Sequence, residues 1–377
     1  MSGSKAFIFE KERNKVHTLT DERFLVSPFF VFFLIYSNII GVGIMSFQRD
    51  IIKSAGYDAW ISVLLTGISI HVLVWMMYRI LTIANNDIIY IHQFCFGKWI
   101  GGLLNVFIII YFLVVALIVF RVYIEVVQVW MFPLMKTWQI SLIFLLLLYY
   151  IVSSGFRVIT GVCFWGTIIP FVFLFPLLFF SLEFAHFNHL LPLFNHSFYE
   201  ILGSSKKMVF QFLGFETLLM FYPFIKNPEK SKKWAHFGVL VTILLYLSIT
   251  IITFIFFNEE HLKHTIWPTL TLLKIAEIPF IERVEYIVVS LWFLVILPHI
   301  SQHLWAVCRG LKKLVNIKQR ISLFICLFLF FLFSNVLESH KQIERLADLY
   351  SSVSFYFIYL YVPFLFLTIN IKQKLSK

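Results

Sequence analysis

The sequence contains little charge. Only 14% of its 377 residues are Asp, Glu, Lys or Arg, whereas 60% are hydrophobic. Because a soluble domain has about 25% charged residues, the composition excludes an ordinary soluble protein and predicts a protein that crosses a membrane several times. The net charge of +11 does not indicate a nucleic-acid partner. The lysines and arginines lie in short segments between apolar runs, where they orient membrane helices.

Cysteine is scarce too, and the motifs of common enzymes are absent. None of the four cysteines, Cys95, Cys163, Cys308 and Cys326, belongs to a CxxC pair. They are typical of small packing residues rather than disulfides or metal ligands. The sequence has no P-loop, nucleophile elbow or HExxH motif. We therefore expect no cofactor, no resident metal and no enzymatic activity. A membrane acyltransferase built on His92 or His299 is disfavoured, since neither histidine has a paired acid nearby in the sequence.

The apolar runs predict an all-α polytopic protein with about ten transmembrane helices. A bilayer crossing needs about 20 apolar residues. The first 23 residues are polar and contain no cleavable signal segment, so residues 1–23 are predicted to be a cytoplasmic tail. A single transmembrane domain over 24–371 and a second cytoplasmic tail over 372–377 follow. The predicted crossings are about 26–47, 59–81, 101–130, 138–153, 160–182, 208–224, 236–257, 285–307, 321–337 and 350–371.

Loop charge predicts the orientation of these helices. With the amino terminus inside, the basic segments 226–233 and 309–320 are cytoplasmic, and the loops 183–207 and 258–283 are external. Ten helices can divide into five plus five. An odd number in each half makes the second half insert upside down, which gives an inverted repeat. The two repeats would cover about 24–182 and about 208–371.

The first apolar run has polar and flexible residues in its middle, namely Asn38, Gly41 and Gly43. Glycine costs a helix interior roughly 0.5–1 kcal/mol relative to alanine. Broken backbone survives at membrane depth only beside protein or a water-filled cavity. One interpretation is a discontinuous helix whose freed amides face a ligand. The alternative is close helix packing, since small residues are common where membrane helices touch.

The sixth run carries a similar irregularity at Gly214 and Glu216, one turn after Gln211. A carboxylate near the membrane centre costs at least about 2.5–3.5 kcal/mol and usually marks function. A protonated or hydrogen-bonded structural acid is the alternative. Because a glycine with a polar neighbour recurs in the first helix of each half, we favour paired broken helices around a midplane site.

Such a site suits a small polar ligand. The amino end of a half-helix favours a carboxylate, and unwound carbonyls with a side-chain acid suit an ammonium group or a cation. A free amino acid carries both charges and is the first expectation, with an uncharged polar ligand as the alternative. Arg121 and Glu125 are four residues apart and predict an ion pair within one helix. His299 and His303 are expected to bond neighbours or line an aqueous vestibule.

Three motifs follow one another along the chain. They are Ile39 through Gly41-Val-Gly43 to Arg49-Asp50, Ala55-Gly56 and Asp58-Ala-Trp60-Ile-Ser62; then Gly214-Phe-Glu216-Thr-Leu-Leu through Pro223-Phe-Ile-Lys226-Asn-Pro228; and then Glu282-Arg283-Val-Glu285 leading to Trp292. In this order they resemble the endospore germination permease family, the B subunits of spore nutrient germinant receptors. The resemblance covers about residues 20–370.

The resemblance implies a LeuT-like five-plus-five fold of the amino acid–polyamine–organocation superfamily. It implies residence in the spore inner membrane and a complex with a membrane A subunit and a lipoprotein C subunit. It also implies that the protein senses a germinant. The ligand-binding residues predicted from the two irregular helices are Asn38, Gly41, Gly43, Gly214 and Glu216. An ordinary proton- or sodium-coupled amino acid permease with the same fold is the rival hypothesis. The histidine-rich segment 186–196 has no assigned role.

Overall fold

The computed structural model describes residues 22–275 and 283–375. Residues 1–21 of the predicted tail 1–23, Glu282 of the third motif and the last two residues lie outside these ranges. Within them, the backbone forms helices and turns, with one isolated parallel bridge between Val26 and Ile225. The all-α prediction is therefore confirmed.

The helices follow the apolar runs closely. Their bounds are α2 Val31–Ile39, α3 Phe47–Ala55, α4 Ala59–Ala84, α5 Ile88–Trp130, α6 Thr137–Ser153, α7 Phe156–Leu174, α8 Phe198–Gln211, α9 Leu218–Phe221, α10 Lys232–Phe256, α11 Glu259–His264, α12 Pro268–Lys274, α13 Val284–Val315, α14 Gln319–Val336, α15 His340–Tyr356 and α16 Val362–Leu375.

These helices make ten crossings in the described ranges. Seven helical stretches are long and apolar enough to span a membrane, and Pro28–Ile39 and Thr137–Ser153 are shorter apolar helices. The first of the seven stretches continues the first crossing through α3 and joins it to the second, α4. The sixth crossing is interrupted and consists of α8 and α9, with η7 (Phe215–Thr217) between them. A π-helical turn at Phe357–Tyr361 joins α15 to α16 as the tenth crossing.

The packing repeats at an interval of five crossings, as an internal five-plus-five arrangement requires. The second crossing, α4, packs against the seventh, α10, and the third, α5, packs against the eighth, α13. The fourth, α6, packs against the ninth, α14. The first crossing packs on the seventh through α2, and the sixth packs in the same way on the second through α8. Each half thus supplies equivalent surfaces to the other.

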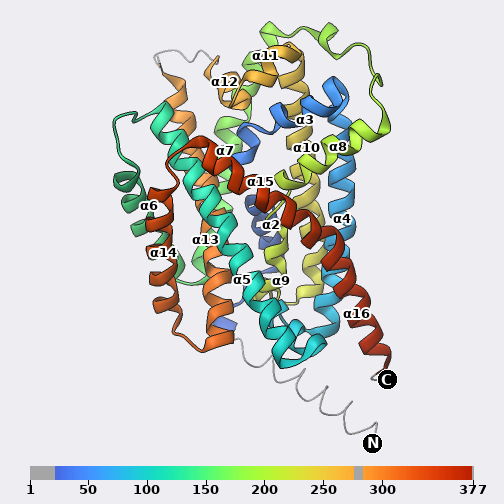
Figure 1. The fold of residues 1–377 in the computed structure, drawn as a ribbon, viewed down its shortest axis with the longest axis vertical. Helices are drawn as coiled ribbons and strands as arrows, with labels where there is room; N and C mark the ends of the chain where they lie inside the picture. The colour runs from blue at the N-terminus through green and yellow to red at the C-terminus, as the bar shows by residue number, and fades with distance from the viewer. Residues whose placement is uncertain (1–21, 276–282, 376–377) are drawn as a thin grey trace, which may run out of the picture.

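The connecting segments gather at two opposite ends of the bundle. Figure 1 shows α11 and α12 at one end and the carboxyl terminus of α16 at the other. Near the α16 end, Lys313 Nζ lies 2.5 Å from Asp87 Oδ2, and Lys226 Nζ lies 3.6 Å from Glu22 Oε1. The basic clusters that were predicted to be cytoplasmic therefore share one end of the molecule, although its orientation in the membrane stays a prediction.

Two helices begin well before the predicted positions, because their sequences carry capping boxes. The sixth crossing starts at Phe198 rather than near 208. Ser197 and Glu200 cap each other's backbone there. The tenth crossing starts at His340 rather than near 350, with Ser339 and Gln342 in the same arrangement. The residues that follow each cap are polar enough to have been assigned to loops.

Other boundaries differ for simple reasons. The eighth crossing, α13, extends to Val315, past the predicted end at 307, and stops where Asn316 adopts a left-handed conformation. The predicted fifth helix, 160–182, starts earlier, at Phe156. It then changes into a 3-10 helix, η5 (Pro176–Phe184). In the predicted external loop 258–283, the described part contains the short helices α11 and α12.

The expected ion pair between Arg121 and Glu125 is replaced by longer-range contacts. Arg121 is buried, and its guanidinium donates to the carbonyl oxygens of Leu337 at 2.7 Å and Glu338 at 3.2 Å. Glu125 instead pairs with His340 at 2.8 Å. Arg121 therefore binds the free carbonyls just after α14, which is a favourable site for a cation.

Candidate ligand-binding site

The first crossing is broken where the sequence predicted. The α2 helix ends at Ile39. Ile40 and Gly41 are both extended, with φ of −79° and −128°, and the short 3-10 helix η3 (Val42–Met45) follows. These values are open to any residue, so the glycines here are not required by a left-handed backbone. What these glycines provide is the absence of a side chain, which leaves room beside the backbone.

The sixth crossing is broken too, and here glycine is required by the backbone. Gly214 has φ of +118°, between the end of α8 and the start of η7. A Cβ atom added at Gly214 would lie 2.0 Å from the carbonyl oxygen of Asn38. The two broken segments therefore contact each other through their backbones. Gly214 is a packing residue at this contact.

The Asn38 side chain joins the two breaks by hydrogen bonds. Its side chain is fully buried, and its amide nitrogen donates to Gly214 O at 2.7 Å and to Thr217 Oγ1 at 2.5 Å. Gln302, on α13, also donates to Thr217 Oγ1, at 2.8 Å. Three crossings thus meet in one buried hydrogen-bond network, in which Asn38 Oδ1 has no partner among the described residues.

Glu216 is fully buried, and both of its carboxylate oxygens have protein partners. Oε2 accepts from the backbone N–H of Gly214 at 2.7 Å, and Oε1 accepts from the hydroxyl of Tyr111 on α5 at 2.8 Å. The Tyr111 ring stacks on Tyr350 of α15 with ring centroids 4.9 Å apart. The carboxylate therefore links the sixth break to the third and tenth crossings.

A cavity of about 330 Å³ reaches the first break. Gly41, Gly43, Gln211 and His299 line it where the helices are interrupted. A Cβ at Gly43 would lie 1.8 Å from Gln211 Oε1, and one at Gly41 would lie 3.6 Å from His299 Nδ1. His299 is buried, and neither of its ring nitrogens has a hydrogen-bond partner in the described part of the chain. His299 can therefore hydrogen-bond to a molecule in the cavity, and the Gln211 amide in the same lining carries both donor and acceptor atoms.

The wall of the cavity away from the breaks is charged. The α15 helix contributes a stripe at helical spacing, and Figure 1 shows α15 running obliquely across the front of the bundle. Arg49 of α3 lies 3.0 Å from Glu344 of α15 and joins the two walls. This stripe explains the polar sequence of α15 and consists of His340, Ile343, Glu344, Ala347, Asp348 and Ser351.

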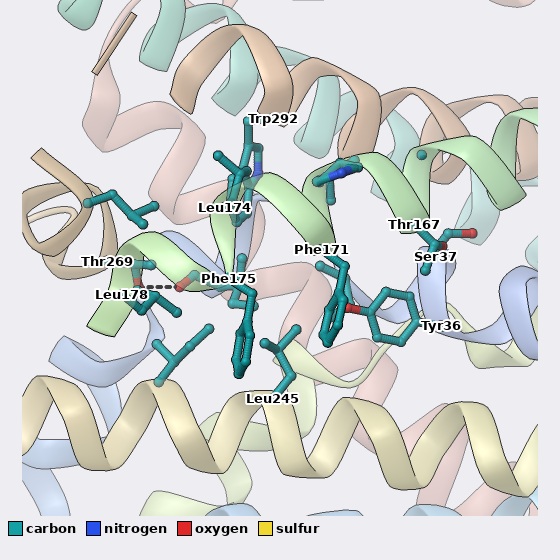
Figure 2. A pocket seen from close by; sticks show the side chains of 17 residues that line it. Tyr36, Ser37, Thr167, Phe171, Leu174, Phe175, Leu178, Leu245, Thr269 and Trp292 are labelled. Carbon is teal, nitrogen blue, oxygen red and sulfur yellow. Dashed lines mark hydrogen bonds between the residues drawn. The ribbon is translucent and has the colours of Figure 1, made fainter. Parts of the chain in front are cut away.

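A second, smaller cavity of about 50 Å³ lies between α2, α7, α10 and α13. Figure 2 shows its mostly hydrocarbon lining, with rings such as Phe171 and Phe175 and with Ser37 and Thr167 at one end. Ser37 Oγ, Thr167 Oγ1 and Trp292 Nε1 in its lining have no hydrogen-bond partner among the described residues, but its volume is small. The larger cavity, which Gly41 and Gly43 line, is the candidate site.

All five predicted residues lie at or beside the two breaks, but only two of them line the cavity. Gly41 and Gly43 line the cavity, whereas Asn38, Gly214 and Glu216 are not part of its lining. Gln211 and His299 also line the cavity, although the sequence did not predict either as a site residue. In the described ranges, no group of three or more His, Cys, Asp or Glu side chains could hold a metal ion, and the expected absence of a metal stays a prediction.

Comparison with known proteins identifies the family. The model of a family described as spore germination protein matches residues 25–343. The chain belongs to this family. It is 45% identical to spore germination protein GerQB of Bacillus cereus over 93% of this chain and 98% of that protein. It is also 25% identical to spore germination protein B2 of Bacillus subtilis (strain 168), over 74% of this chain and 75% of that protein. Family membership places this multi-pass protein in the spore inner membrane.

The fold resembles that of a transporter. A solved structure of a Na⁺-coupled sialic acid symporter, in a substrate-bound outward-open state, superposes with a TM-score of 0.57 over 99% of this chain and 84% of that chain. The sequence identity is 8%, so the likeness concerns the fold. It agrees with the LeuT-like arrangement of two broken crossings.

Proposed function

We propose that this protein is the germinant-sensing, transporter-like subunit of a spore nutrient receptor. The observation that carries the proposal is the cavity that ends at the broken first crossing in a member of a germination protein family. The proposed partners are a membrane A subunit and a lipoprotein C subunit. Proteins A2 and B2 of Bacillus subtilis both align with most of this chain, so they are its counterparts, and the proposed partners rest on the family resemblance alone.

The ligand is a small nutrient bound at the inner end of the cavity. An amino acid remains the first candidate, with the exposed backbone at Gly41 and Gly43 binding its charged ends. The side chains nearest that backbone, Gln211 and His299, are an amide and an imidazole, whereas Arg49 and Glu344 lie on the outer helices. This distribution supports an uncharged polar nutrient as the second candidate for the same site.

Ligand binding would act by changing the balance between two conformations. A ligand shifts such an equilibrium only by its difference in affinity for the two states. The α15 helix contributes to the outer cavity wall and also contacts Tyr111, which binds Glu216. Closure of α15 over a bound nutrient would therefore be transmitted to the sixth break, and partner subunits would read the altered surface.

The proposal is tested by replacing Gln211 with alanine in spores and measuring germination as a function of nutrient concentration, normalised to receptor abundance. We expect the half-maximal concentration to rise about tenfold or less, because one neutral hydrogen bond contributes about 0.5–1.5 kcal/mol. Gln93→Ala is the matched control, since Gln93 is an exposed glutamine of α5 that does not line the cavity. Equal curves for the Gln211 variant and the parent at every nutrient tried would refute the proposed site.

The rival function, a proton- or sodium-coupled permease, is favoured by the transporter fold. It predicts that the purified protein in vesicles accumulates labelled nutrient against its gradient when an ion gradient is imposed. Binding of the nutrient without accumulation supports the receptor function. Accumulation, together with an unaltered germination response in a deletion strain, would replace it with the permease.

A further inference from the structure

The connection between η5 and α8 has a surface that is unusual for a segment between crossings. From Phe184 to Tyr199 the sequence contains no Asp, Glu, Lys or Arg. Seven large apolar or aromatic side chains of this segment are between 46% and 84% exposed. They are Phe184, Phe187, Leu191, Leu193, Phe194, Phe198 and Tyr199. The segment lies in the predicted external loop 183–207, and its exposed surface is largely apolar despite its histidines.

The segment is held firmly in this conformation. The buried carboxylate of Asp58 accepts backbone N–H bonds from Phe194 at 2.7 Å, Asn195 at 2.7 Å and His196 at 3.0 Å. Phe194 has φ of +59°, which a bulky residue rarely adopts, and these bonds support it. The backbone of His186 is tied to Ile255 O at 2.7 Å. The exposed rings are therefore presented outward by fixed backbone.

One of the exposed rings contacts α4, a helix with an exposed apolar face. The Phe194 ring packs edge-on to Trp60, near the start of α4, with centroids 6.4 Å apart. Along α4, exposed apolar side chains recur at helical spacing, which is the pattern expected of a helix face in contact with lipid. The hydroxyl of Ser62 on α4 donates to Ile201 O at 3.0 Å and so joins α4 to α8. The exposed α4 residues are Leu65, Ile68, Val72 and Trp75.

We propose that residues 184–199 lie in the outer interface of the membrane, with their exposed rings inserted at the boundary between headgroups and acyl chains. Two features support lipid as the occupant. The patch contacts α4, the helix with the exposed apolar face, through Phe194 and Trp60, and it lacks the permanent charges that burial near hydrocarbon would penalise. Aromatic rings are enriched at this depth, and the uncharged polar side chains among them can bond to headgroups and water. A partner protein that covers the same rings is the competing occupant.

An anchored connection would control the outer half of the sixth crossing. The α8 helix begins directly after this segment, at the Ser197–Glu200 capping box, and ends at Gln211 in the cavity wall. A fixed depth at one end of α8 restrains its tilt and hence the position of Gln211. This consequence rests on the proposed nutrient site, whereas the membrane contact itself does not.

Spin labels measure the contact directly. Single cysteines at Leu191, Phe194 and Tyr199, in a full-length chain with Cys95→Ser, are labelled and reconstituted into phosphatidylcholine and phosphatidylglycerol vesicles. Collision rates with oxygen, which concentrates in lipid, and with a water-soluble nickel chelate then report depth. Labels at Ile68 and His264 provide the references, since they are exposed on α4 and on α11 respectively.

We expect the three labels to show at least threefold lower nickel accessibility than His264 and oxygen accessibility approaching that of Ile68. Nickel accessibility equal to that of His264 at all three positions would overturn the proposal. Protection that appears only after addition of the other receptor subunits would also overturn it and identify a protein-binding surface instead. Each labelled protein is first shown to elute as the parent does in gel filtration, so a misfolded variant is not scored.

Discussion

Gly214 and Gly43, one at each break, should respond differently when each is replaced by alanine. At Gly214, a methyl group would lie 2.0 Å from the backbone oxygen of Asn38, and the residue has φ of +118°. At Gly43, a methyl group would lie 1.8 Å from Oε1 of Gln211, which is the end of a flexible side chain. Backbone cannot move away as a side chain can, so Gly214→Ala should affect folding and Gly43→Ala should affect ligand response.

The structure gives magnitudes for both changes. An unfavourable left-handed conformation costs about 1–3 kcal/mol, and overpacking adds about 1–3 kcal/mol. Gly214→Ala should therefore cost about 2–6 kcal/mol, a large part of a typical domain stability of about 5–15 kcal/mol. Gly43→Ala should displace the Gln211 amide for about 0.5–1.5 kcal/mol. The loss of one hydrogen bond to ligand corresponds to roughly tenfold or less in apparent affinity.

The assay combines immunoblotting of spore membranes with a germination dose–response curve. We expect Gly214→Ala to reduce protein abundance severely. Gly43→Ala should leave abundance normal and shift the curve to higher nutrient concentration, and the bulkier Gly41→Leu and Gly43→Leu should nearly abolish the response. Normal abundance for Gly214→Ala would refute the backbone contact with Asn38. Loss of the Gly43→Ala protein would show that this glycine serves packing alone.

Three further outcomes are expected. Glu216→Gln should barely move the dose–response curve at equal abundance, because Glu216 lies outside the cavity lining and both its oxygens bind protein donors; a shift of roughly ten- to a hundredfold would show that the carboxylate contacts ligand or a coupling cation. Glu216→Ala should lower abundance, because the two buried donors that the carboxylate binds are left unpaired. Reversing the charge of Arg49 or Glu344 alone should change the response less than about fivefold, since the pair is partly exposed; the double reversal should restore it, and failure to do so would refute a direct pairing. A cysteine at Lys232 should resist an impermeant reagent added outside, whereas one at His264, in the predicted external loop and outside residues 184–199, should react, and equal labelling would contradict the predicted topology.

The sequence alone determined those features that depend on residues close together in the chain, namely the crossings and their breaks. Apolar runs of membrane length predicted the crossings, and the polar and glycine interruptions near Gly41 and Gly214 predicted both breaks. These predictions succeed because a helix at membrane depth must satisfy its own backbone, so an interruption is visible locally. The early start of α8 was missed although Ser197 and Glu200 form a local capping signal, because the residues after it are too polar to suggest a crossing.

Only the tertiary structure decided which polar groups meet. Glu216 binds Tyr111, Arg121 binds the carbonyls after α14, and Gly41 lies beside His299, each pair being distant in the sequence. Spacing along one helix predicted a local partner for Arg121, and that prediction was wrong. For Glu216 the sequence left a ligand contact and a hydrogen-bonded structural acid open, and its partner on α5 is visible only in the structure. A buried polar side chain is satisfied by whichever helix packs against its face, and that depends on the orientation of ten crossings rather than on the order of residues in any one of them.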